Sequence, residues 1–162
     1  MARLCISPSS IEANPRAILA IEQADAIIVG PGNFFSSLLP IFLVPGLKDA
    51  VKRSHAKKIY VANLFTQKGH TDTLTLPDFL RVFTQYIGED IFTHVLYNSR
   101  AIPASGTAVQ IPKAVRSDKR FIGRALANMT ARQISASDPI AKMRARFLHD
   151  AGKLGKAIAQ LL

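Results

Sequence analysis

The sequence has few cysteines, few acidic residues and no long apolar run, features that disulfide-rich, membrane and secreted proteins would need. Its 162 residues include one cysteine, no tryptophan and only 11 acidic residues. A lone Cys5 excludes a disulfide scaffold within the chain. No apolar run approaches the roughly 20 residues of a bilayer span, because Pro40 interrupts residues 38–44, and the N-terminus lacks the long apolar stretch of a secretory signal. We therefore expect a soluble, cytoplasmic protein with no membrane contact.

Apolar and basic residues are plentiful instead. The chain is 48% hydrophobic, which excludes a disordered protein, and its length suits one domain spanning residues 1–162. Most of the net charge of +10 lies in residues 111–162, which hold eleven basic and three acidic side chains. Nucleic-acid binding is the weakest of our alternatives, because Phe121 and Phe147 are the only aromatics there. We expect a solvated basic face.

The hydrophobic pattern alternates between strands and helices. We expect strands at 3–7, 26–29, 59–62 and 92–97. We expect three helices over 47–54, 76–87 and 151–162, and two more that start at Asn14-Pro15 and near Ser37. Residues 108–111 fit a strand or a hairpin piece, and residues 121–138 show no clean period. Such alternation is typical of an α/β fold with parallel strands and helical crossovers. Ligands of such sheets bind at the carboxyl ends of the strands, where loops 30–37, 63–73 and 98–106 should gather.

The loop Gly30–Ser37 (GPGNFFSS) has the composition of an anion-binding loop. Glycine lets main-chain N–H groups approach a phosphate closely, and Asn33, Ser36 and Ser37 add side-chain donors. A helix starting near Ser37 would direct its positive end to the same place. The spacing matches neither the Walker nor the dinucleotide fingerprint, and a tight strand-to-helix turn explains the same residues.

This loop and its flanks, ADAIIVGPGN at 24–33 followed by Ser36, Ser37 and Pro40, resemble the signature of the CofD/YvcK-like family. That family joins 2-phospho-L-lactate transferases of coenzyme F420 synthesis to YvcK-type gluconeogenesis factors. Residues 61–69, 95–98 and 149–154 resemble its later motifs. The resemblance implies a Rossmann-like three-layer sandwich with a mainly parallel sheet that binds a nucleotide or nucleotide-sugar.

The sequence also departs from this family. The glycine-rich nucleotide loop on the family's first strand has no counterpart, so the chain resembles a C-terminal portion, and we expect a homo-oligomer or a partner that supplies the missing half. His70 replaces the usual glutamate, Phe79 the usual histidine, and Leu148 the usual arginine before the His-Asp pair. Losing that arginine weakens a conventional diphosphate clamp.

Two functions follow from the resemblance. The first is a regulatory, non-catalytic protein of YvcK type that binds UDP-sugar-like ligands and is linked to carbon metabolism and cell-wall synthesis. The alternative is a CofD-like phospholactyl transferase using Mg²⁺, for which Asp72 and Asp78 are the available carboxylates. The four histidines lack metal-ligand spacing, so we expect no other metal site. The predicted phosphate-binding residues are Gly30, Pro31, Gly32, Asn33, Ser36 and Ser37, and those bordering the sugar or base are Asn63, Thr66, His70 and Thr71.

Overall fold

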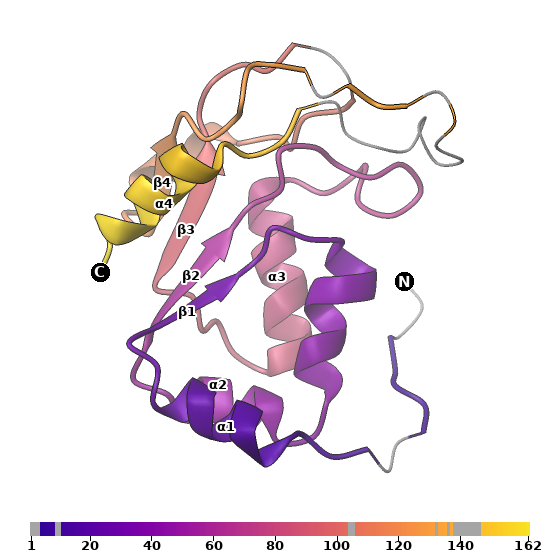
Figure 1. Cartoon of the computed structure of the whole chain (residues 1–162), viewed down its shortest axis with the longest axis vertical. Helices are drawn as coiled ribbons and strands as arrows, with labels where there is room; N and C mark the ends of the chain where they lie inside the picture. Colours follow the sequence, from indigo (N-terminus) through magenta and orange to yellow (C-terminus); the bar gives the residue numbers. More distant parts are fainter. Residues whose placement is uncertain (1–3, 9–10, 104–105, 132, 136, 138–146) are drawn as a thin grey trace.

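The chain folds around one parallel β-sheet. The computed structural model describes residues 4–8, 11–103, 106–131, 133–135, 137 and 147–162. The strands are β1 (Ala26–Val29), β2 (Lys57–Val61), β3 (His94–Asn98) and β4 (Phe121–Arg124), hydrogen-bonded in the order β1-β2-β3-β4 (Figure 1). Every neighbouring pair is parallel. The predicted α/β class and parallel sheet are confirmed.

Helical segments cover both faces of the sheet. The α-helices are α1 (Pro15–Glu22), α2 (Leu47–Arg53), α3 (Leu76–Ile87) and α4 (Ala151–Ala159), joined by a π-helical turn η1 (Phe34–Leu38) and two 3-10 turns, η2 (Leu39–Leu43) and η3 (Lys113–Ser117). One face carries α3 with η1 and η2, and the other carries α4 (Figure 1). This gives the three layers that the resemblance implies.

The helix ends follow from local hydrogen bonds. In α1 the side chain of Asn14 accepts a bond from the N–H of Arg16 at 2.9 Å, and Pro15 occupies the first turn, as predicted. In α3, Thr75 and Asp78 form a reciprocal capping box, and Gly88 ends the helix at φ +98°. Both helices therefore begin where the sequence predicts, and α3 also ends at the predicted residue.

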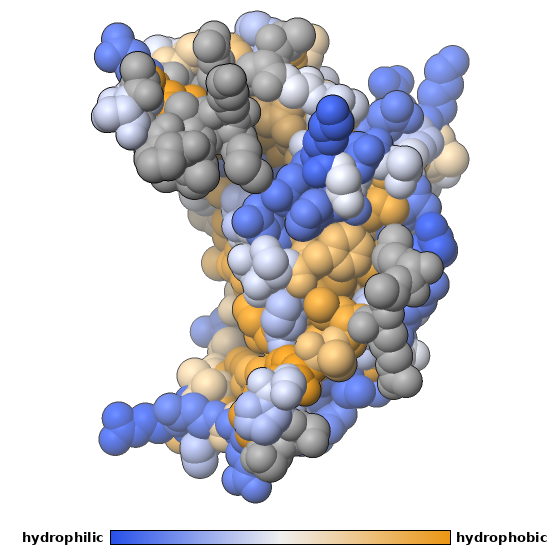
Figure 2. Space-filling view, turned by 90° about the vertical axis from the view of Figure 1, so that its right-hand side faces the viewer, coloured by the Kyte–Doolittle hydropathy of each residue, from blue (hydrophilic) through white to orange (hydrophobic). Residues whose placement is uncertain are grey.

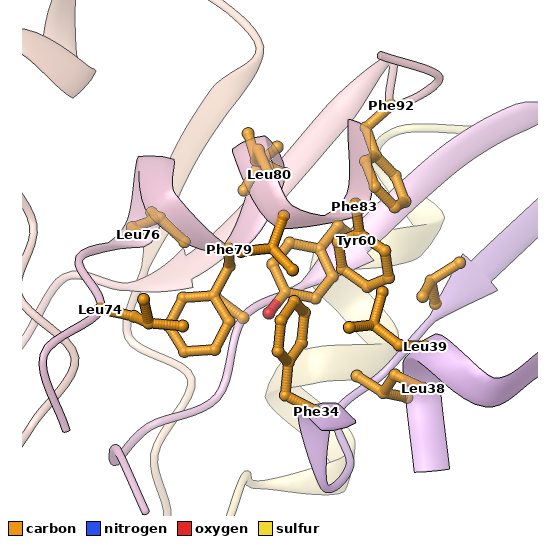
Figure 3. Packing of buried hydrophobic residues seen from close by; sticks show 14 of the residues in the cluster. Phe34, Leu38, Leu39, Tyr60, Leu74, Leu76, Phe79, Leu80, Phe83 and Phe92 are labelled. Atoms are coloured by element: carbon orange, nitrogen blue, oxygen red, sulfur yellow. The ribbon is translucent and has the colours of Figure 1, made fainter. Parts of the chain in front are cut away.

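The two faces of the sheet carry different cores. Phe34, Phe79 and Phe83 pack edge to face on the α3 side, with ring centroids 4.8 Å (Phe34–Phe79) and 4.9 Å (Phe34–Phe83) apart (Figure 3). Tyr60 of β2 lies among them, and complete burial raises the pKa of its hydroxyl. The α4 side has a smaller aliphatic cluster, whose buried members are Ile59, Val61, Leu96, Leu126 and Ala157.

Several predicted elements were wrong or missed. Residues 4–7 form no strand, and the N–H of Leu4 instead donates to the Tyr86 hydroxyl at 3.0 Å. Strand β4 was not predicted, and residues 108–110 make only isolated bridges to Phe65 and Thr75. The helix expected near Ser37 begins at Phe34 as a π-helical turn, and α4 stops at Ala159.

Apolar surface remains around the N-terminal segment and on the outer strand. Figure 2 looks onto the face where residues 4–6 and 11 border a groove of about 860 Å³ against η2 and α3, with apolar side chains across its centre. On β1, an outer strand of the described sheet, Ile28 is 41% exposed. Self-association through this edge stays a prediction.

The described residues include no single helix that is long and apolar enough to cross a membrane. A bent pair, Phe34–Leu43 with Leu47–Arg53 at 80°, meets that criterion only when its two parts are taken together.

Candidate functional site

The loops that follow β1, β2 and β3 meet at the carboxyl edge of the sheet, at the top of Figure 1. The side-chain amide of Asn63, just after β2, donates to the carbonyl of Gly32 at 3.0 Å. The main-chain N–H of Thr66 donates to Thr107 at 2.8 Å, and that of Val109 to Leu64 at 3.2 Å. The predicted convergence of these loops is therefore present in the structure.

Gly30 brings the first loop onto the end of β2. Its φ is +88°, and a Cβ at this position would lie 2.8 Å from the carbonyl oxygen of Val61. Any other residue would suffer both an unfavourable backbone angle and a clash with main-chain atoms. The sequence therefore has a glycine at the point where the chain leaves β1 and its backbone lies directly against the end of β2.

The loop directs apolar side chains inward and polar ones outward. Phe34 is 2% exposed and packs into the aromatic core (Figure 3). Ser36 and Ser37, by contrast, are exposed. The helical segment begins at Phe34, and the Asn33 side chain makes no capping hydrogen bond. The N–H groups of residues 34–36 have no acceptor inside a helix that begins there. Buried Phe34 thus anchors the loop while its polar edge stays at the surface.

Three buried side-chain polar atoms have no hydrogen-bond partner among the described residues. They are the hydroxyl of Tyr60 in the aromatic core, and Oδ1 of Asn63 and Nε2 of His149 just beyond β2. The ring of His149 also shares a hydrogen bond with the backbone of Ala62. Burial lowers the pKa of His149 below its usual 6.5, while that backbone bond opposes the shift. Buried polar groups are normally paired, so the atoms of Asn63 and His149 depart from the usual pattern at this edge of the sheet.

Main-chain pairing brings His149 to this position. Residues 126–128 run antiparallel to 148–150, with the N–H of Asn128 donating to Leu148 at 2.8 Å and that of Asp150 to Leu126 at 2.7 Å. Asp150 then caps α4 by accepting from the N–H of Lys153 at 2.9 Å. Sequence reasoning noticed the His-Asp pair but did not place His149 in the site; a histidine directly before a helix cap was the available signal.

Thr66 and Thr71, also predicted to border the ligand, differ from Asn63 because their hydroxyls already have partners within the protein. Thr71 is buried and its hydroxyl accepts from the N–H of Gln67 at 2.8 Å, whereas the Thr66 hydroxyl donates to Thr107 at 3.1 Å. Both hydroxyls therefore shape the loop itself. His70 is exposed on the same loop. Ligand roles for these three residues, as for loop 30–37, stay predictions.

The two aspartates considered for Mg²⁺ have separate surroundings. Asp78 accepts from the N–H and hydroxyl of Thr75 at 2.9 and 2.6 Å and pairs with Arg81 at 2.9 Å, and these bonds hold its pKa at about 2. Its carboxylate thus serves the helix cap, while Asp72 is exposed. In the described part of the chain, no three His, Cys, Asp or Glu side chains gather to form a metal site.

Comparisons with known proteins agree with this architecture. The sequence model of the family described as "2-phospho-L-lactate transferase CofD" matches residues 1–137. A putative gluconeogenesis factor of Aquifex aeolicus is 34% identical over 161 residues, covering 97% of this chain and 47% of that protein. A gluconeogenesis factor of Bacillus subtilis is 38% identical over 101 residues, covering 62% of this chain and 32% of that protein.

A solved structure shows the same fold. The crystal structure of protein BH3568 from Bacillus halodurans aligns with a TM-score of 0.80 at 26% identity, covering 98% of this chain and 50% of that one. The chain spans about half the length of the Aquifex relative. With the family model, the gluconeogenesis-factor relatives and this shared fold in agreement, the chain belongs to the CofD family.

Proposed function

We propose that this chain binds a nucleotide or nucleotide-sugar, of the UDP-sugar class, at the carboxyl edge of its sheet. The observation that carries the proposal is the hydrogen bond between Asn63 and loop 30–37 at the end of β2, next to Ala62, to which His149 bonds. Asn63 bonds to the loop through its amide nitrogen and keeps a buried, unpartnered oxygen. A ligand there could satisfy the free N–H groups of the loop with phosphate oxygens and the Asn63 oxygen with a sugar hydroxyl.

The charge of the molecule supports an anionic ligand. The net charge of +10 attracts anions, and the exposed loop serines add donors at the edge where the N–H groups lie. His149 is kept neutral by burial at neutral pH, so its Nε2 suits a hydroxyl more than a phosphate. The phosphates would therefore lie over loop 30–37, with the sugar or base toward Asn63 and His149.

A regulatory role fits this site better than catalysis. The relative that matches 97% of this chain and the one that matches 62% of it are both named gluconeogenesis factors, the first as a putative one. The Asp78 carboxylate is held by Thr75 and Arg81, which leaves it poorly suited to bind Mg²⁺. We therefore propose a ligand sensor linked to carbon metabolism and cell-wall synthesis.

The second candidate is a CofD-like transferase. The family model carries the name of 2-phospho-L-lactate transferase, which favours transfer of a phospholactyl group with Mg²⁺. Product formation from a guanosine-diphosphate-linked substrate and a deazaflavin alcohol would establish it. Absence of product with Mg²⁺ present would remove it.

Calorimetry with UDP-glucose tests the first candidate directly. We expect saturable heat, and about tenfold weaker binding for Asn63→Ala, because a ligand group loses its buried partner. The matched control is Asn128→Ala, since Asn128 is exposed and its side chain bonds only locally to Thr130. No heat at millimolar UDP-glucose, or equal weakening by both variants, would contradict the proposal.

A further inference from the structure

A second polar cavity lies at the end of β3, beside the loop site. Its volume is about 250 Å³, and its lining residues include Asn63, Asn98 and the exposed Arg100 and Arg116. Its other walls come from main chain and apolar side chains after β2 and β3 and from residues 108–111. Among the described residues, no carboxylate lines it. The described lining therefore combines two arginines with amide residues and contains no acidic residue.

Among the arginines that the structure describes, Arg53, Arg81 and Arg120 form ion pairs, whereas Arg16, Arg100, Arg116 and Arg124 do not. Arg53, Arg81 and Arg120 each form an ion pair with a carboxylate at 2.9 Å or less. Within the described ranges, neither Arg100 nor Arg116 has such a partner. Guanidinium groups bind carboxylates and phosphates through two parallel hydrogen bonds, so two unpaired ones on one small cavity form a site for an oxyanion.

Both arginines stand on well-anchored main chain. The side-chain amide of Asn98 donates to the carbonyl of Arg100 at 2.6 Å, and the N–H of Ser99 donates to Arg124 at 2.9 Å. Arg116 lies in η3, which is held by Val115 at 3% exposure. The positions from which the two side chains extend are therefore set before any ligand binds.

We propose that Arg100 and Arg116 form an oxyanion subsite, separate from loop 30–37, that binds a phosphate or carboxylate group. The two regions share Asn63, which bonds to Gly32 on one side and lines the cavity on the other. A volume of about 250 Å³ suits one acidic group with its neighbouring atoms, not a whole nucleotide. This inference about the ligand rests on the proposed function. It implies that the nucleotide-sugar carries a second acidic group, which binds at this subsite, in addition to the phosphate group over loop 30–37.

Titration with small anions tests the subsite without a nucleotide. Inorganic phosphate and malonate are added separately to the ¹⁵N-labelled chain at low ionic strength, and amide shifts are followed. We expect saturable shifts at residues 98–102 and 114–117 with at least one of the two anions. The anion that saturates them identifies the subsite as one for phosphate or for carboxylate.

Charge-matched variants separate the subsite from a general charge effect. Arg100→Gln and Arg116→Gln should each weaken binding about tenfold, because each removes a charged bidentate partner. Arg16→Gln, which removes the same charge from the exposed surface of α1, should change it less than twofold.

Three results would overturn the subsite. They are the absence of saturable shifts with both anions, equal weakening by all three arginine variants, and shifts confined to residues 30–37. The last result would leave the loop site intact. Saturation at the arginines without any binding of UDP-glucose would instead support the subsite and remove the proposed function.

Discussion

The two faces of the sheet differ in how strongly they are packed. On the α3 side Phe34, Tyr60, Phe79, Phe83 and Phe92 are each at most 4% exposed and pack ring against ring. The cluster on the α4 side is aliphatic and smaller. Loop 30–37 is anchored in the first face through Phe34, whereas His149 directly precedes α4 on the second. The two halves of the candidate site therefore depend on cores of unequal strength.

Removing the loop's anchor should have the largest effect. Phe34→Ala leaves a cavity among Phe79 and Phe83 and should cost about 3–5 kcal/mol of unfolding free energy. Urea unfolding followed by circular dichroism measures it. Phe35→Ala, at the half-buried neighbouring position, should cost clearly less. Equal losses would mean that the aromatic core does not hold the loop.

Gly30→Ala tests the contact between the loop and β2. We expect a loss of about 2–4 kcal/mol, because strain at a positive φ adds to a Cβ placed 2.8 Å from the Val61 carbonyl. Gly69→Ala is the matched control, since Gly69 has φ +78° but no atom within 4 Å of its Cβ position. A control loss as large as that of Gly30→Ala would show that the close approach contributes nothing.

Truncating a side chain on the α4 side of the sheet should lower the free energy of unfolding by less than truncating Phe34 on the α3 side. Leu154 of α4 is half-buried, and Leu154→Ala should lower the unfolding free energy by about 1–2 kcal/mol, below the range for fully buried leucines. Leu162→Ala, at a position 64% exposed, should change it little. A loss at Leu154 matching that of Phe34→Ala would erase the difference between the faces.

The smallest effect concerns pH. Because burial lowers the pKa of His149 in the folded chain, unfolded chains bind more protons, and stability should fall as pH drops below the ordinary value of 6.5. We expect a contribution of less than about 1 kcal/mol, since the side chain is only partly buried. His149→Gln should remove this part of the pH dependence in chemical unfolding between pH 5 and 8. Identical slopes for both proteins would contradict it.

Local signals explain which elements could be predicted. Helix α3 has Pro77 in its first turn, a capping pair and Gly88 at its end, so its bounds follow from neighbouring residues. Strand β4 has no such signal. It pairs with β3 through half-buried residues, and its Gly123 is required by Tyr97, whose ring would lie 2.9 Å from an added Cβ. That requirement comes from a neighbouring strand and is invisible in the local sequence.

The candidate site was predicted only in part for the same reason. Loop 30–37 and Asn63 follow buried strands, so their meeting follows from the topology of a parallel sheet. The placement of His149 depends on residues 126–128 pairing with 148–150, and that of Arg116 on a 3-10 turn. The pairing that places His149 is a long-range contact that no local pattern records, whereas the η3 turn is held by local bonds such as that from the N–H of Val115 to Pro112.

Amide shifts in a UDP-glucose titration of the ¹⁵N-labelled chain test the central claim most directly. We predict saturable shifts at residues 30–37 and at Asn63 and His149, with none on α1. No shifts at millimolar ligand, or shifts confined to residues away from the carboxyl edge, would contradict it.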